Sequence, residues 1–320
     1  MALDEFELAR ERGLFVLGIL TGILILCIIA GNLIVIFSFI RCNFEVFVAT
    51  KYFIFSMAVA DILLGAIHLP MVMASHIGGN QIAKLPAVCI IRHASAMGIY
   101  SAVMCNHVAV AVDRYIAIIC PLRYHTLMTK KIAIIILVVI WIFSCMLMTA
   151  PVMIRISGDK QTGSDIMNYC GPYREIWPLV DKHGILAFLV FITVIPVILY
   201  IRIFLVARKQ QRFLAAVIRM ASSDERKMNQ HTAKIMTLLH CIFVLFWFPF
   251  LGTIPMYFID VNTNVRDVVV RSAIFLANCN SAVNPFVYFL LKREFNFACK
   301  AFLQRNLPCL LNRDSEESSL

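Results

Sequence analysis

The stretch CIIRHASAMGIYSAVMCNHVAVAVDRY, residues 89–115, decides the fold of this chain. It is a long apolar run that ends in an acid, an arginine and a tyrosine, Asp113-Arg114-Tyr115. A helix rises about 1.5 Å per residue, so Cys89 and Arg114 would lie about 37 Å apart along it. The hydrocarbon core of a bilayer is only about 30 Å thick. The two residues are therefore predicted to lie at opposite faces of a membrane, joined by one helix.

The composition of the 320 residues also indicates an integral membrane protein. Hydrophobic residues make up 61% of the chain and charged residues 15%, against about 25% charged in a soluble domain. The mean hydropathy is +0.82. The net charge of +10 does not indicate nucleic-acid binding, because the basic residues lie between the apolar runs and form no motif with interleaved aromatics.

Apolar runs predict an all-α protein built as a bundle of seven transmembrane helices. With the N-terminus outside, 19 Lys and Arg residues fall on the inner side and 10 on the outer side. Cytoplasmic loops carry the excess of positive charge, so the N-terminus is predicted outside and the C-terminus inside. The predicted spans are Leu14–Ile40, Tyr52–Ala74, Val88–Cys120, Ile132–Met153, Ile185–Val206, Thr232–Ile259 and Val268–Leu291.

The remaining segments are assigned from their charge and amphipathicity. A stretch that follows the last span interleaves phenylalanines with basic residues, which is typical of a short helix lying in the membrane interface. The predicted organisation is an extracellular N-terminus at 1–13, the bundle at 14–291, an amphipathic eighth helix at 292–303 and a cytoplasmic tail at 304–320.

A group of polar residues lies at one depth inside the predicted spans. Asp61 is in the middle of an apolar span, where a carboxylate costs at least about 2.5–3.5 kcal/mol and needs partners. The functional interpretation is a hydrated cavity that holds a sodium ion, the one candidate cofactor and metal. The alternative is a protonated Asp61 in a hydrogen-bond network. The candidate partners are Asn32, Asn280, Ser281 and Asn284.

Three prolines interrupt predicted spans and are expected to kink their helices. With the residues around them they form a set that resembles the rhodopsin-like (class A) G protein-coupled receptors along the whole chain. Within that class, residues 49–61 and 275–285 are most similar to adenosine receptors, whereas residues 116–129 are also similar to odorant and other chemosensory receptors. The matching positions are Gly31-Asn32, Ala60-Asp61, Cys89, Asp113-Arg114-Tyr115, Trp141, Cys170, Pro196, Trp247-Phe248-Pro249 and Asn284-Pro285-Phe-Val-Tyr288.

The resemblance implies a switch that faces a heterotrimeric G protein. Arg114 would hold Asp113 at rest and swing toward the G protein when the sixth helix moves outward. Tyr115 completes the motif, Leu122 would pack into the G protein and Tyr288 would rotate inward. Such a switch needs two states that differ by a few kcal/mol, so that a ligand can shift their populations.

The cysteines and the acidic tail predict modifications and further partners. By the resemblance, Cys89 and Cys170 would form an outer disulfide, in segments where oxidising conditions permit one. Cys299 and Cys309 flank the basic amphipathic stretch, where palmitoylation or unmodified thiols are both expected outcomes. Phosphorylated serines of the acidic tail could recruit arrestin-like proteins, and the terminal Leu320 could fit the groove of a PDZ-domain protein.

Four positions depart from the pattern of the family. Asn229 stands where many members carry an acid that clamps Arg114, and Phe204 replaces a tyrosine of the fifth helix. Val103 replaces a hydroxyl residue near the sodium site. His107 lies where an apolar gate is usual, and it is either functional or a buried histidine bonded to a neighbour. Asn229 and His107 suggest raised basal signalling, whereas Phe204 would act in the opposite direction.

The ligand pocket is predicted from the same resemblance. Ala96 stands where amine receptors carry an aspartate, and Asn278 stands where retinal proteins carry a lysine, which argues against both ligands. Ile254 replaces an asparagine that adenosine receptors use, which argues against adenosine bound in the usual way. The similarity of residues 49–61 and 275–285 still makes an adenosine-like or another small non-amine molecule the expected ligand. Arg92, His93 and Arg271 could hold an anionic headgroup or face solvent. The predicted pocket, which could also be a plain packing core, comprises Ala96, Met97, Tyr100, Trp247 as toggle, Phe250, Ile254, Ile274 and Asn278.

These features predict a multi-pass G protein-coupled receptor of the plasma membrane, with a small-molecule ligand and a G protein as partners. A chemosensory receptor is the alternative within the class. A transporter that uses Asp61 and His107 as a proton or ion path is the alternative outside it. Transporters usually contain internal repeats, and none is visible. No paired catalytic carboxylates and no HExxH motif are present, so no catalytic residue and no enzymatic activity are predicted.

Overall fold

The computed structural model describes residues 2–41, 48–83, 85–120, 123–162, 241–257 and 262–291, with the isolated positions 194, 198, 201, 202 and 205. Over these ranges the chain is helical and contains no strand. The elements are α1 (Ala2–Arg41), α2 (Val48–Leu63), the π-helical turn η1 (Leu64–His68), α3 (Leu69–Ile77), α4 (Gly79–Ala83), α5 (Pro86–Ile119), α6 (Tyr124–Leu127), α7 (Lys130–Thr162), a helix at Cys241–Thr253, the 3₁₀ turn η4 (Ile254–Tyr257) and α10 (Thr263–Leu291).

Four apolar stretches in the described part of the chain are long enough to cross a membrane. They correspond to the first four predicted spans. The predicted sixth span is described in part, as Cys241–Thr253, and the seventh is α10. The predicted fifth span, apart from the isolated positions, and the predicted eighth helix and tail lie outside the described residues. The four stretches are Leu8–Ile40, Ala49–Ile77, Ile90–Ile119 and Lys130–Thr149.

The second span is not one uninterrupted α-helix. The π-helical turn η1 separates α2 from α3, and Pro70 lies in the first turn of α3. Proline has no N–H and its ring crowds the carbonyl four residues earlier, here that of Ala66. A wider turn before the proline relieves this crowding. The turn carries His68, which is buried inside the bundle.

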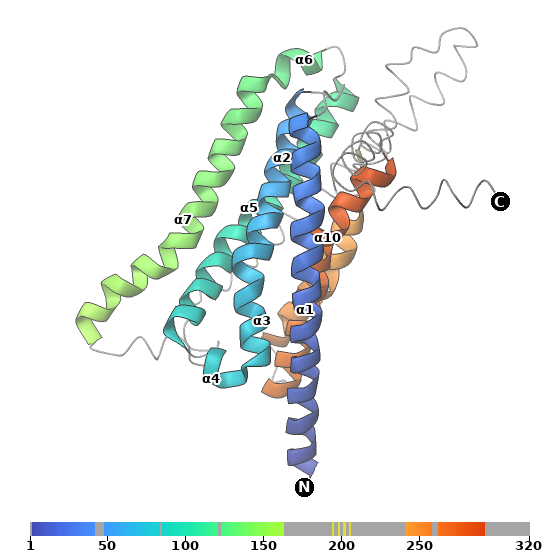
Figure 1. The fold of residues 1–320 in the computed structure, drawn as a ribbon. Coiled ribbons are helices and arrows are strands. Elements are labelled where there is room, and N and C mark those ends of the chain that lie inside the picture. The colour runs from blue at the N-terminus through green and yellow to red at the C-terminus, as the bar shows by residue number, and fades with distance from the viewer. Residues whose placement is uncertain are drawn as a thin grey trace, which may run out of the picture.

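The helix α5 lies at the centre of the described bundle. In its membrane stretch 61% of residues are buried, whereas in that of α7 only 17% are. It packs against α2 and α7, while α1 packs against α2, α3 and α10 (Figure 1). Two glycines allow close helix contacts. A Cβ on Gly98 would lie 2.6 Å from Cβ of Met148 in α7, and one on Gly31 would lie 2.9 Å from Cγ of Pro285 in α10.

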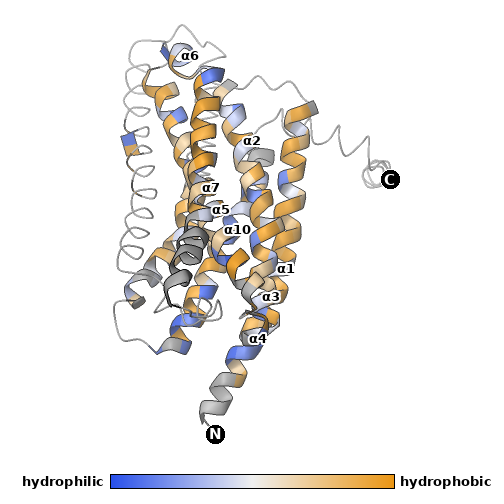
Figure 2. Cartoon of the chain, turned by 90° about the vertical axis from the view of Figure 1, so that its left-hand side faces the viewer, coloured by the Kyte–Doolittle hydropathy of each residue, from blue (hydrophilic) through white to orange (hydrophobic). Residues whose placement is uncertain are grey.

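The outer surface of the bundle is apolar. Leu26 of α1 and Ile135 and Val139 of α7 are 70%, 61% and 60% exposed. Figure 2 shows hydrophobic residues along most of α1 and α7, with hydrophilic residues toward their ends. Such a surface is suited to contact with lipid, because apolar side chains need no hydrogen-bond partners in the hydrocarbon region.

Candidate functional site

One candidate site is the buried polar cluster around Asp113 and Arg114 at the end of α5. Both side chains are almost fully buried. Arg114 donates to Oδ2 of Asp113 from Nε, at 2.9 Å, and from Nη2, at 2.5 Å. Thr50 of α2 donates to the same oxygen at 2.7 Å and accepts a hydrogen bond from Nη2 of Arg114. The charge pair is thus fixed by hydrogen bonds, as a buried ion pair requires.

Tyr124 of α6 completes this cluster. Its hydroxyl donates to Oδ1 of Asp113 at 2.7 Å, and its side chain is buried. Burial, and secondarily the negative charge of Asp113, raise the pKa of Tyr124 above its usual value near 10. The phenol therefore stays protonated and donating at neutral pH. Arg114 and Asp113 are consequently held by residues of α2, α5 and α6.

A second polar group surrounds Asp61 and joins α1, α2 and α10. Asn284 donates to Oδ2 of Asp61 at 3.1 Å, and the hydroxyl of Ser281 also lies within hydrogen-bonding reach of that carboxyl group. Asn32 donates to the backbone carbonyls of Ser281, at 3.1 Å, and of Ile28, at 2.9 Å. Four buried oxygens of this group have no hydrogen-bond partner among the described residues. They are Oδ1 of Asn32, Asp61, Asn280 and Asn284.

His107 lies between these two groups, at the junction of three helices. Its side chain is buried, and Nε2 lies 3.4 Å from Nδ2 of Asn280 in α10. Its ring also packs on Phe243, of the helix at Cys241–Thr253, with ring centroids 4.2 Å apart. The histidine therefore connects α5 to α10 and to the helix at Cys241–Thr253.

Two of the predicted pocket residues, Tyr100 and Phe250, contact Trp247. Tyr100 contacts the Trp247 ring edge-on at a centroid distance of 5.6 Å and donates to Oδ1 of Asn278 at 2.9 Å. Phe250 contacts Trp247 from another side at 5.9 Å. The indole Nε1 of Trp247 is buried and has no hydrogen-bond partner in the described part of the chain. Of the other pocket residues, Ala96, Met97 and Ile274 are half-buried on the same helices.

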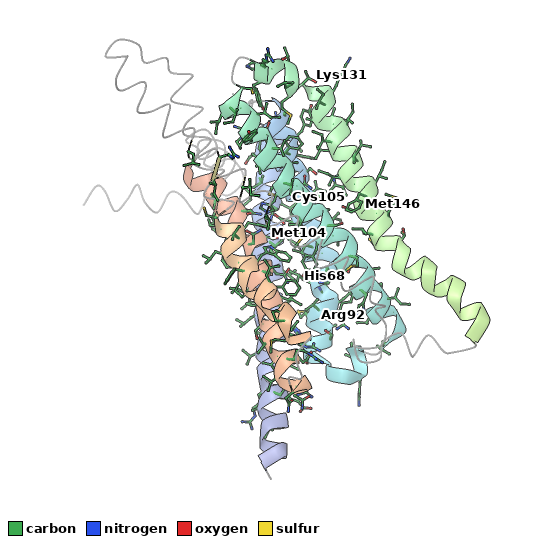
Figure 3. The ribbon with its side chains drawn as sticks, turned by 180° about the vertical axis from the view of Figure 1, so that it is seen from behind. His68, Arg92, Met104, Cys105, Lys131 and Met146 are labelled. Carbon is green, nitrogen blue, oxygen red and sulfur yellow. The ribbon has the colours of Figure 1, made fainter. Side chains whose placement is uncertain are left out.

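Sequence reasoning missed His68, which extends the pocket toward α3. Its ring lies edge-on to Tyr100 at 5.1 Å, and Nδ1 lies 3.0 Å from the hydroxyl of Ser95. Figure 3 labels His68 in the interior, with Arg92 nearer the end of the bundle that carries the N-terminus. A histidine inside an apolar span, two residues before a proline, is the signal that could have identified it.

Thr50 and Tyr124 were also missed, because a threonine and a loop tyrosine carry no signal of their own. Among the described residues, no cluster of three or more His, Cys, Asp or Glu side chains could hold a metal ion. Some of the predicted site residues lie outside the described part of the chain, namely Leu122, Cys170, Phe204, Asn229, Cys299 and Cys309. The structure also does not describe the side chains of Cys89, Ile254 and Tyr288.

The helical bundle, with its buried acid–arginine pair, can be compared with known proteins. Residues 31–288 match the family described as "7 transmembrane receptor (rhodopsin family)". The chain belongs to this family. It is therefore a multi-pass membrane receptor of the class A G protein-coupled type and is not an enzyme. The seven-helix bundle predicted from the apolar runs is supported by this membership.

Receptors for different ligands have the same sequence identity to this chain. The alpha-1D adrenergic receptor of Homo sapiens is 28% identical over 92% of this chain, which spans 57% of that protein. The adenosine receptor A2b of Rattus norvegicus is 28% identical over 88% of this chain and 87% of its own length. The histamine H2 receptor of Cavia porcellus is 28% identical over 95% of this chain and 83% of its own. These identities do not select one ligand class.

Proposed function

We propose that this receptor binds a small extracellular non-amine ligand and activates a heterotrimeric G protein at the opposite membrane face. The observation that carries the proposal is a series of contacting rings between the two sites. His107 packs on Phe243, Phe243 lies 5.9 Å from Trp247, and Trp247 contacts Tyr100. A ligand beside Trp247 can therefore bias the packing two turns above Arg114.

The pocket chemistry argues against an amine ligand. Two of the relatives are by name receptors for adrenergic amines and histamine. Ala96 offers no carboxylate to an ammonium group, and the described residues that pack on Trp247 carry no charge. The candidate ligands are therefore adenosine-like or other small non-amine molecules, including chemosensory ones.

The topology and further partners belong to the same proposal. The N-terminus lies outside and the C-terminus inside the plasma membrane, which follows from the distribution of Lys and Arg. An eighth helix at 292–303, with Cys299 and Cys309 as lipidation sites, would lie on the inner surface. The tail would recruit arrestin-like and PDZ-domain proteins once the receptor is active.

A ligand panel tests the proposed activity. Nucleosides, nucleotides, lipids and odorant-type molecules would be applied to purified receptor, with nucleotide exchange on a G protein as the readout. At least one class should stimulate exchange, and Arg114→Ala should abolish the response without abolishing binding. A ligand-free ionic current or proton flux in expressing cells, together with no exchange, would favour the transporter alternative.

The residues around Asp61 fit a sodium ion, which would supply a positive charge to this network. The four buried oxygens that have no hydrogen-bond partner among the described residues are the type of ligand atom that hard cations prefer. Replacing choline chloride by sodium chloride at equal ionic strength should raise the melting temperature of the receptor, and Asp61→Asn should remove this effect. Val103→Ser, which adds an oxygen beside the network, should strengthen it. A sodium effect that survives Asp61→Asn would contradict the assignment.

A further inference from the structure

A group of basic side chains gathers near the end of the bundle that carries the N-terminus. Arg271 of α10 donates from Nε to Oδ1 of Asp267 at 2.8 Å, and Nη1 of Arg10 in α1 lies 3.9 Å from the other oxygen. His76 of α3 lies within electrostatic range of Arg271, Asp267 and Arg92 of α5. Four helices thus contribute to one charged group.

The group contains three guanidinium groups, which are always protonated. Among the described residues, Arg10 and Arg271 share the carboxylate of Asp267. The side chains of Arg10 and Arg271 are only 17% and 25% exposed. Positive charge held at such low exposure is stabilised by an anion.

Two observations show that this group has unmet hydrogen-bonding capacity. His76 is 6% exposed, and its Nδ1 is buried with no hydrogen-bond partner among the described residues. The guanidinium of Arg271 carries five N–H donors, and its hydrogen bond to Asp267 uses one of them. Buried polar atoms nearly always have a partner, so Nδ1 of His76, within electrostatic range of Arg271 and Arg92, is suited to a polar ligand.

The basic group and the floor of the predicted pocket lie on the same two helices. Arg92 and Tyr100 lie on α5, and Arg271 and Asn278 on α10, so the basic group and the pocket floor are about 10 to 12 Å apart along each helix. The floor has its own orphaned donor, Nε1 of Trp247.

We propose that the ligand is an amphiphile with one anionic headgroup, a carboxylate or a phosphate. Arg271, Arg92 and His76 hold the headgroup, and the apolar body reaches about 12 Å toward Trp247. This inference rests on the proposed function insofar as the same molecule is the agonist. The binding itself does not depend on a G protein.

Binding of matched probes tests the headgroup. Full-length receptor in phosphatidylcholine nanodiscs would be titrated with decanoate, decyl phosphate and decanol, and the affinity measured calorimetrically without G protein. Decanoate and decyl phosphate should bind at least about tenfold tighter than decanol, because charge-assisted hydrogen bonds to arginine are strong. Equal affinity for decanol, or no binding of the anionic probes, would overturn the proposal.

Variants of Arg271 test whether this residue binds the anionic headgroup. Arg271→Gln should weaken decanoate about tenfold and leave decanol unchanged, whereas Arg271→Lys, which keeps the charge, should lose less. Arg266→Gln is the matched control, because Arg266 is on the same helix but about 140° around its axis. Thermal melting of each unliganded variant verifies folding. An Arg271→Gln receptor that is folded and still prefers decanoate to decanol would overturn the assignment.

Two further measurements are needed. One distinguishes failure of this inference from failure of the proposed function, and the other distinguishes a free ligand from a lipid of the bilayer. If decanoate binds wild type through Arg271 but stimulates no nucleotide exchange, the site stands and the agonist role fails. If another compound stimulates exchange and decanoate does not bind, the inference alone fails. Adding phosphatidylglycerol to the nanodiscs should weaken decanoate binding in wild type and not in Arg271→Gln if the bilayer itself supplies the headgroup.

Discussion

Asp113 shows how a single residue is controlled by segments that are distant in sequence. Its two carboxylate oxygens accept hydrogen bonds from Arg114 beside it, from Thr50 in α2 and from Tyr124 in α6. A charged hydrogen bond is worth about 1.5–3 kcal/mol, so the loss of one donor can change a two-state equilibrium about tenfold or more.

Replacing Tyr124 tests this control. Tyr124→Phe removes the donor to Oδ1 of Asp113 and should raise basal nucleotide exchange several-fold, because Arg114 is then released more easily. Thr126→Val, which removes an exposed hydroxyl in the same short helix, is the control and should have little effect.

The pH dependence of this contact follows from the raised pKa of Tyr124. A phenol with a folded pKa above its unfolded value near 10 contributes its full stability below pH 10 and loses it as the pH rises further. The difference between wild type and Tyr124→Phe should thus be constant from about pH 6 to 9. A difference that disappears within this range would contradict the assigned role.

His107 is the second residue with a predicted effect on basal activity. A polar ring in an otherwise apolar layer lowers the cost of letting water in when the helices separate. His107→Leu should therefore reduce basal exchange, by about two- to fivefold if one weak hydrogen bond is at stake. Met104→Leu, a volume-conserving change at a buried position of α5, should leave it unchanged. Unaltered exchange in His107→Leu would reject raised basal signalling as a property of this histidine.

At the scale of elements, the contact between α5 and α7 depends on a glycine. A Cβ at Gly98 would lie 2.6 Å from Cβ of Met148 and 3.0 Å from the carbonyl oxygen of Ser144, which is closer than backbone and side-chain atoms normally approach. The side-chain bond from Nε1 of Trp141 to the hydroxyl of Ser56, at 3.0 Å, fixes α7 on α2 at the same time. The helix can therefore not shift to relieve the clash without losing a buried hydrogen bond.

Alanine substitutions test this close contact. Gly98→Ala should destabilise the receptor by about 1–3 kcal/mol, measured as a lower melting temperature in detergent. Gly13→Ala in α1, where nothing lies within 4 Å of the new Cβ, should be neutral or stabilising by up to about 1 kcal/mol. Equal effects at both positions would show that the α5–α7 contact can expand at little cost.

At the scale of the whole molecule, the charge distribution predicts the orientation in the membrane. Inner segments hold 19 of the 29 Lys and Arg residues if the N-terminus is outside. A tag at the N-terminus should accordingly bind antibody on intact cells, and a tag at the C-terminus only after permeabilisation. The reverse pattern would place Arg114 outside and contradict coupling to a G protein.

Much of the fold follows from hydrophobicity along the chain. The first four predicted spans, the seventh and part of the sixth coincide with described helices. The predicted boundaries differ where polar residues continue a helix. α1 begins at Ala2 rather than near Leu14, and α7 continues to Thr162 rather than ending at Met153. Hydropathy marks the part of a helix that lies in lipid, not the part that continues beyond it.

The sequence alone determined that this is a seven-helix membrane receptor and named candidate residues for its switch and pocket, because membrane energetics and motif spacing act locally along the chain. Only the tertiary structure decided the partners of these residues: Thr50 and Tyr124 at Asp113, His68 at Tyr100, and His76 beside Arg271. These contacts join different helices, and which side chains meet depends on how the helices pack. The spacing of apolar residues and the amino-acid composition do not specify that packing.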